Sequence, residues 1–365
     1  MNVIYLLVIL IPAFISTMFI PYWTRRTESF GVSIPEDVYH ADNIKQLRKK
    51  YVIYSGIASL ILTIVFLLLG STNMDDTTLS LYFSGLVFIY LFATFLIYLY
   101  FHRIMKQLKQ QENWSKEKSQ ATFVKTDFRS KKLNHSNLWF TISFIITFAM
   151  IALTFINYDK IPEKIPMQYN FDGEITNWAT KSERSVLMMP IMSLYLTLLF
   201  MFLNTMIAKA KQQISAERPE ESLQQNIIFR RRWSAFLIGT GLGTTILLSF
   251  MQLSLIYPVN QQLMTIVPMI FALIITVWAI ILSVTTGQGG SRVKISMGAN
   301  GEVINRDEDK YWKLGVFYFN PKDPALFLEK RFGVGWTINL GRPMAWVFFI
   351  GIIAIAVGIP YLLGM

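Results

Sequence analysis

The sequence predicts an all-α polytopic membrane protein with about eight transmembrane helices. Three observations indicate this fold class: 53% of the 365 residues are hydrophobic, only 16% are charged, and the apolar residues gather in long runs. Soluble domains usually carry about a quarter charged residues. The aromatic content of 15% agrees with Trp and Tyr side chains at bilayer interfaces.

A transmembrane helix needs roughly 20 predominantly apolar residues, and eight segments of the chain meet that requirement. They are residues 3–23, 51–69, 81–100, 138–158, 186–206, 233–255, 266–286 and 343–363. No charge precedes the first segment, whereas Arg25 and Arg26 follow it. We therefore expect a retained helix and not a cleaved signal peptide.

The lysines and arginines determine the predicted orientation. Thirty of the 34 lie in four alternate loops, residues 24–50, 101–137, 207–232 and 287–342. Because positive loops stay on the cytoplasmic side, we expect both termini outside, in a bacterial cytoplasmic membrane. The formal net charge of +11 then reflects topology and attraction to anionic lipid, and we expect no direct binding of nucleic acid.

On this basis the chain divides into five parts: a three-helix region (1–137), a helix–loop–helix unit (138–206), two further helices (207–286), a cytosolic insert (287–342) and a last helix (343–365). In the first part, Ser33-Ile34-Pro35-Glu36 is a capping-box pattern with Pro at the first helical position. It predicts a cytoplasmic helix that begins there and runs into the second span. An amphipathic stretch after residue 101 extends the third span.

Catalytic chemistry is not visible in the sequence. The chain has no cysteine, and its three histidines show no paired spacing. Metalloprotease, nucleophile-elbow and Walker patterns are absent, and the Gly-rich stretch 287–292 lacks the Lys-Ser/Thr ending of a phosphate loop. The spans hold no ionisable residue near their centres, which argues against a proton-coupled pump. We expect no catalytic residue, cofactor or metal ion, and no enzymatic activity.

Small residues recur on one face of the sixth predicted span. Ala235, Gly239 and Gly243 are four residues apart and let another helix approach closely. Internal helix packing is the simplest interpretation. A seam between copies in a homo-oligomer, or a groove for an apolar peptide, is the alternative.

The loop 161–181 is the only substantial outer loop. Its two prolines constrain the backbone, residues 168–171 alternate polar and apolar as a short strand does, and Asp172-Gly173 is a strong turn signal. We expect an ordered structure that either covers the helix bundle or binds an external ligand. The candidate ligand residues are Pro162, Pro166, Gln168, Asn170, Asp172, Gly173, Trp178 and Lys181.

Residues 138–206 resemble a bacterial membrane domain of unknown function that occurs in immunity proteins against the sporulation-delaying-protein (SDP) toxin. The resemblance rests on the skeleton Pro162, Pro166, Asn170, Gly173, Trp178 and Lys181. It implies that the outer loop binds a peptide toxin. It also implies that the protein resides in the cell membrane of a Gram-positive bacterium. The family often has histidine where this chain has Gln168, so any metal binding or proton sensing by that histidine would be lost here.

Aromatic and β-branched residues flank Asn320-Pro321 and Asp323-Pro324 in the insert and predict short strands or a hairpin. This stretch resembles a second domain of unknown function, at the C-terminus of related membrane proteins. Its interleaved aromatics and cations could stack on nucleic acid, meet lipid headgroups or dock a cytosolic protein. The candidate contact residues are Tyr311, Trp312, Lys313, Lys330, Arg331 and Trp336.

Our leading hypothesis is a receptor-like immunity or stress-response protein. It would bind an external peptide or envelope-active agent and relay its occupancy to the insert. The resemblance also implies a cytosolic transcription regulator as partner, since the SDP immunity protein holds a repressor at the membrane. A small-molecule or lipid transporter without visible ion coupling is the alternative, and a membrane enzyme ranks last.

Overall fold

The computed structural model describes residues 3–71, 76–114, 132–169, 174–211, 219–294 and 309–362. The protein is mostly helical, as predicted, with small β-hairpins. The helices are α1 (Val3–Trp23), α2 (Asp42–Gly70), α3 (Asp76–Gln111), α4 (Phe140–Ile156), α5 (Glu183–Val186), α6 (Met188–Lys209), α7 (Pro219–Leu253), α8 (Gln261–Thr286) and α9 (Pro343–Leu362).

Six of the described helices are long and apolar enough to cross a membrane: α2, α3, α4, α6, α7 and α8. Helices α1 and α9 contribute shorter apolar helical stretches, Leu10–Trp23 and Pro343–Ile355, which are not among these six. The exposed side chains of these helices are largely Ile, Leu, Val and Phe, as expected where lipid replaces water. The chain is therefore a helical membrane protein.

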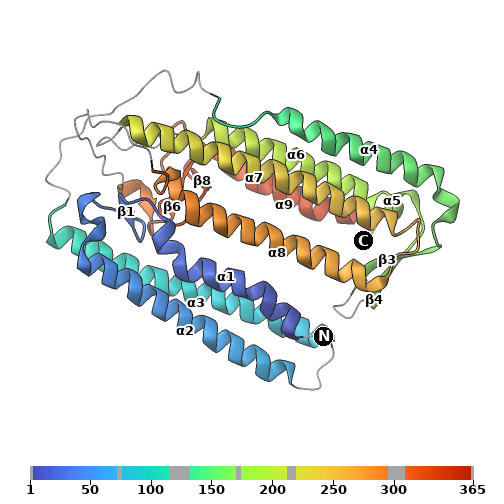
Figure 1. The fold of residues 1–365 in the computed structure, drawn as a ribbon, viewed down its shortest axis with the longest axis horizontal. Coiled ribbons are helices and arrows are strands. Elements are labelled where there is room, and N and C mark those ends of the chain that lie inside the picture. The colour runs from blue at the N-terminus through green and yellow to red at the C-terminus, as the bar shows by residue number, and fades with distance from the viewer. Residues whose placement is uncertain are drawn as a thin grey trace.

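The helices form two groups that run side by side (Figure 1). One group contains α1, α2 and α3, and the other contains α4, α6, α7 and α9, with α8 between them and in contact with both α1 and α7. The β3–β4 hairpin lies at one end of the molecule, called here the hairpin end. Strands β1, β6 and β8 lie at the opposite end, called here the junction end because the insert meets the helices there.

In the described residues, four antiparallel hairpins lie between the helices. They are β1–β2 (Glu28–Ser29, Val32–Ser33), β3–β4 (Lys164–Tyr169, Ile175–Thr180), β5–β6 (Trp312–Lys313, Phe317–Tyr318) and β7–β8 (Phe327–Glu329, Trp336–Ile338). The strands expected in the outer loop and in the insert are confirmed.

The helix predicted to begin at Ser33 and run into the second span is wrong. Ser33 belongs to β2, its amide donates to Asp309 Oδ1 (3.3 Å), and only a 3₁₀ turn (Asp37–His40) follows. Ala41 is extended, with ψ of 145°, and α2 begins after it at Asp42. Pairing with the distant insert thus overrides the local capping pattern.

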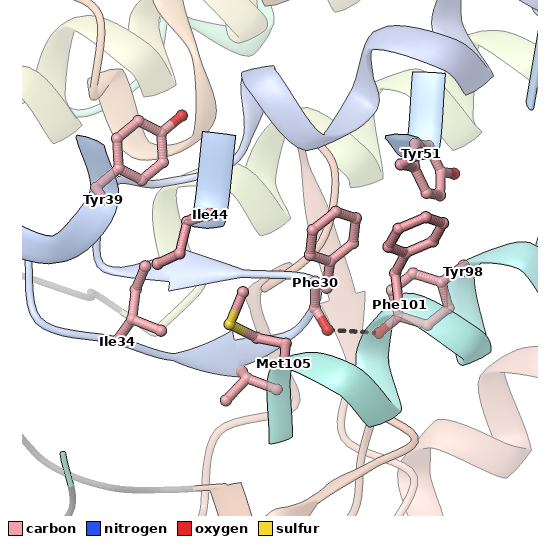
Figure 2. Packing of buried hydrophobic residues seen from close by; sticks show 9 residues of the cluster. Phe30, Ile34, Tyr39, Ile44, Tyr51, Tyr98, Phe101 and Met105 are labelled. Atoms are coloured by element: carbon pink, nitrogen blue, oxygen red, sulfur yellow. Dashed lines mark hydrogen bonds between the residues drawn. The ribbon is translucent and has the colours of Figure 1, made fainter. Parts of the chain in front are cut away.

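The largest buried apolar cluster lies at the junction end, where the loop after α1 inserts between α2 and α3 (Figure 2). Phe30 is 1% exposed and stacks on Phe101 of α3, with ring centres 5.4 Å apart. The Tyr98 hydroxyl lies 3.3 Å from the carbonyl oxygen of Phe30 and shares its one hydrogen between this oxygen and that of Leu314. This packing fixes the β1–β2 hairpin on the helix ends.

The small residues of α7 serve packing against α8. A Cβ added at Gly239 would lie 2.6 Å from the Trp278 ring, and one at Gly243 would lie 2.7 Å from the Phe271 ring. Each glycine therefore accommodates an aromatic side chain of the neighbouring helix. Ala235 is exposed, so the helix-packing face does not extend to it.

Candidate functional site

The β3–β4 hairpin is a small folded structure and not a slack connection. Its register pairs Pro166 with Trp178 and Gln168 with Asn177, with an irregularity after Pro166. Beneath it, Ile165 packs in a buried cluster with Val186 of α5 and Ile256, which follows α7. The apolar contacts attach the hairpin to three helix ends.

The outer face of this hairpin carries two of the predicted ligand residues. Gln168 and Trp178 are exposed, the indole to 50%. Pro162 is exposed and Pro166 half-buried. Such an isolated aromatic can bury apolar surface of a ligand at small entropic cost. Asn170, Asp172 and Gly173 lie outside the described residues.

Lys181 contacts residues at the base of the hairpin. Its Nζ lies 4.7 Å from the centre of the Tyr158 ring and 4.0 Å from Glu163 Oε1. Its backbone amide donates to the carbonyl of Glu163 (2.8 Å). These contacts close the base of the hairpin, so we assign Lys181 to its support.

Gln252 joins α7 to the support of the hairpin. Its side chain is 1% exposed, and Nε2 donates to Thr154 Oγ1 of α4 and to the carbonyl of Val186, both at 2.9 Å. A buried amide with two such bonds holds α7 in one position against α4 and α5. Any shift of the hairpin base would disturb these bonds.

At the junction end, α7 meets the insert through a fully buried ion pair. Arg230 and Glu329 are both 0% exposed and lie 3.5 Å apart. Asn226 Nδ2 donates to Glu329 Oε1 (2.7 Å), and Asn226 Oδ1 accepts from Arg230 Nε (2.7 Å). Arg25, from the loop after α1, donates to the other carboxylate oxygen. One carboxylate therefore holds three chain segments together.

Arg230 also satisfies the end of α6. Its Nη1 donates to the carbonyl of Ile207, and its Nη2 donates to those of Ala210 (3.1 Å) and Lys211 (3.3 Å). The last carbonyls of a helix have no partner within it, and a cation there is favourable. The guanidinium thus links α6, α7 and the insert.

A second group of charges adjoins the first. Asp309 accepts hydrogen bonds from Arg331 and from Lys109 of α3 (2.7 Å to Nζ), and Glu28 of β1 lies 3.8 Å from Arg331. Burial alone would raise the pKa of Asp309, but the charges of Arg331 and Lys109 outweigh it and hold that pKa below its ordinary value. We call the two groups together the charged junction. It comprises Arg25, Glu28, Lys109, Asn226, Arg230, Asp309, Glu329 and Arg331.

Glu28 differs from the other carboxylates of the junction. Burial raises its pKa to about 7, and the nearby charges of Arg331 and Arg25 offset this only in part. Its Oε2 is buried without a hydrogen-bond donor among the described residues. Below about pH 7 the protonated form is thus favoured in the folded protein.

We expect Glu28→Gln to raise thermal stability at pH 8 by on the order of 2 kcal/mol and to leave it unchanged near pH 4.5. The folded state holds a proton that the unfolded chain releases between pH 4.5 and about 7. Wild-type stability therefore falls as pH rises through that window, and the glutamine does not titrate. Unfolding of both proteins in detergent at several pH values measures this. The same dependence of stability on pH in the two proteins would contradict the prediction.

Sequence reasoning identified two of the junction residues, Arg331 as a contact candidate and Arg25 as a topology signal. It missed the role of the other six, among them Asn226, Arg230 and Glu329. The charged residues entered only the count of loop charges, and Asn226 was not singled out. The i, i+4 spacing of Asn226 and Arg230, which places them on one helix face, was the available signal.

The predicted contact residues of the insert divide into two sets. Trp312 and Arg331 are buried, 5% and 4% exposed, and the Arg331 guanidinium lies 5.1 Å from the Trp312 ring centre. Tyr311 and Trp336 are half-buried, the latter with its ring 5.0 Å from Phe229. Lys313 and Lys330 are exposed. Only the last two have the exposure that a headgroup or docking contact requires.

Between the two ends, neutral polar side chains line the interior of α4, α6 and α7. Thr147 and Ser193 share a hydrogen bond (2.8 Å), and Ser234 Oγ donates to Asn204 Oδ1 (2.6 Å). Ser143, Thr197 and Thr240 are buried hydroxyls without a partner among the described residues. In the part of the chain that is described, no group of His, Asp and Glu side chains could hold a metal ion.

Two short stretches match known family models. Residues 145–194, from α4 through the hairpin into α6, match a domain of unknown function (DUF1648), which is associated with membrane proteins. Residues 321–346, which include β7, β8 and the start of α9, match a family of unknown function (DUF5808). No curated protein and no solved structure matches the chain. The comparisons therefore support both resemblances to domains of unknown function, and the first of them agrees with a membrane protein. They assign no activity.

Proposed function

We propose that the chain is a receptor-like immunity or stress-response protein. It binds an external peptide or envelope-active agent at the β3–β4 hairpin and relays occupancy to the charged junction. The observation that carries this proposal is that α7 reaches from the hairpin end to the junction and has a buried polar side chain at each place. Gln252 lies under the hairpin, and Asn226 and Arg230 lie in the junction, about 33–39 Å away along the same helix.

The same proposal includes the orientation. All eight apolar helices cross the membrane, with the termini and the hairpin outside a bacterial cytoplasmic membrane. The charged junction then faces the cytosol, where a transcription regulator is the proposed partner. The basic loops at the junction end support this orientation.

A challenge assay tests the receptor role. We expect cells that lack the protein to be more sensitive to an SDP-type peptide, and Trp178→Ala to be as sensitive as the deletion. The matched control is Trp139→Ala, because Trp139 is similarly exposed (53%) but lies at the start of α4, at the opposite end. Equal sensitivity of the wild type and the deletion would exclude this role.

The relay has its own test. The chain lacks cysteine, so Lys330→Cys provides a single site for a fluorophore next to the junction. We expect the peptide to change its emission in the wild-type background and not with Gln252→Leu, which removes both hydrogen bonds at the hairpin end. An unchanged response in Gln252→Leu would refute transmission through α7.

A small-molecule or lipid transporter is the second candidate. The polar interior of α4, α6 and α7, with its unpartnered hydroxyls, favours it because such groups can line a path. Flux of solute or lipid across vesicles containing the purified protein distinguishes this function from a receptor.

A further inference from the structure

The β5–β6 hairpin of the insert presents an apolar surface to its surroundings. Leu314, Phe317 and Phe319 are 48%, 45% and 45% exposed, whereas Trp312 and Tyr318 of the same hairpin are buried. Three large apolar side chains exposed within six consecutive residues are unusual for a segment bathed in water. Such a surface indicates an interaction site.

The helix α3 determines the depth of this hairpin relative to the membrane. The Tyr98 hydroxyl donates to the carbonyl of Leu314 (2.9 Å), and Val316 packs on the buried cluster that contains Phe101. In α3 the apolar run ends at Phe101, and His102 and Arg103 follow. The hairpin tip therefore lies where α3 leaves the hydrocarbon.

The start of α9 gives the same depth independently. The amide of Leu340 donates to the carbonyl of Tyr318 (2.9 Å), so β6 is joined to the segment just before Pro343. Trp346, in the first turn of α9, is 53% exposed and donates from Nε1 to the carbonyl of Leu340 (3.1 Å). Trp favours the headgroup level of a bilayer.

Exposed cations flank the apolar tip in the sequence. Lys310, Lys313 and Lys322 are exposed. Among the residues that the structure describes, Lys313 and Lys322 form no ion pair with a carboxylate. Exposed apolar groups flanked by unpaired lysines are complementary to a bilayer surface that carries anionic lipid.

We propose that the β5–β6 hairpin docks on the membrane at the junction end. Leu314, Phe317 and Phe319 insert at the headgroup–acyl boundary, and Lys313 and Lys322 contact the phosphates of anionic lipids. This inference does not depend on the receptor function. It makes the bilayer a third support of the insert, beside α3 and α9.

Spin labels on single cysteines test the proposal in the full-length protein, reconstituted in bilayers with and without phosphatidylglycerol. We expect labels at Phe317→Cys and Phe319→Cys to be accessible to lipid-soluble oxygen and shielded from a water-soluble nickel chelate. The matched references are Tyr100→Cys, at the end of the apolar run of α3, and Gln111→Cys, at the exposed end of the same helix about 16 Å further on.

Labels at both hairpin positions that behave as at Gln111 would overturn membrane docking and leave a surface open to a protein partner. The lipid preference is measured separately, by association of a spin-labelled phosphatidylglycerol. We expect Lys313→Gln and Lys322→Gln each to weaken it by up to about fivefold, and the exposed control Lys45→Gln, which pairs with Asp42, to have less effect. No change with both substitutions would refute the role of the lysines.

Discussion

Replacement of Glu329 by Gln is expected to destabilise the protein by about 3–5 kcal/mol. Glu329 is 0% exposed and is the carboxylate that faces both Arg230 and Arg25. The amide preserves the shape and can still accept from Asn226, but it leaves the buried charge of Arg230 without its counter-charge. Loss of one partner of a buried pair costs far more than loss of an exposed pair.

Thermal unfolding of the purified variant in detergent measures this, together with its monodisperse yield. The matched control is Asp42→Asn, which removes an exposed pair with Lys45 and should cost less than about 1 kcal/mol. A double variant, Arg25→Gln with Glu329→Gln, should be less destabilised than the sum of the two single variants, because both remove the same contact. An effect of Glu329→Gln no larger than that of Asp42→Asn would disprove the role of the junction in stability.

Gly290→Ala is expected to be about as damaging, at about 4 kcal/mol, for a steric reason. Gly290 follows α8 with a φ of +82°, and a Cβ there would lie 2.1 Å from the backbone carbonyl oxygen of Gln225 in α7. Both the glycine and the carbonyl belong to the main chain, so neither can move aside as a side chain can. The substitution must push the exit of α8 away from α7, next to Asn226.

Gly335→Ala separates this collision from the cost of backbone conformation. Gly335 also has a positive φ, +111°, but nothing lies within 4 Å of an added Cβ. We expect its alanine variant to lose only about 1–2 kcal/mol in the same unfolding assay. Similar losses at the two positions would show that φ, and not the contact with α7, determines the effect.

The sequence predicted the parts of this protein that depend on local composition. Apolar runs of membrane length indicated the helices, and the turn signal at Asp172-Gly173 together with Pro166 and Trp178 indicated the β3–β4 hairpin. The charged junction could not be predicted in this way. The contacts that bring its segments together join residues about a hundred to three hundred positions apart, such as Asn226 with Glu329 and Arg25 with Glu329. Local patterns carry no information on such pairs.

The start of α2 shows how a local pattern can also mislead. Ser33 begins a capping-box pattern that predicts a helix, yet in the structure Ser33 pairs with Glu28 of β1 and donates to Asp309. The function of the hairpin and the candidate residues Gln168 and Trp178 stay predictions until the challenge assay is done.

The separation of 304 residues between Arg25 and Glu329 has a consequence for biogenesis. During synthesis, the first helices leave the ribosome and enter the bilayer long before the carboxylate exists. Neither Arg25 nor Arg230 can form its pair with Glu329 until synthesis has passed residue 329. A chain that stops before Glu329 therefore leaves both arginines without the carboxylate that neutralises them in the folded protein.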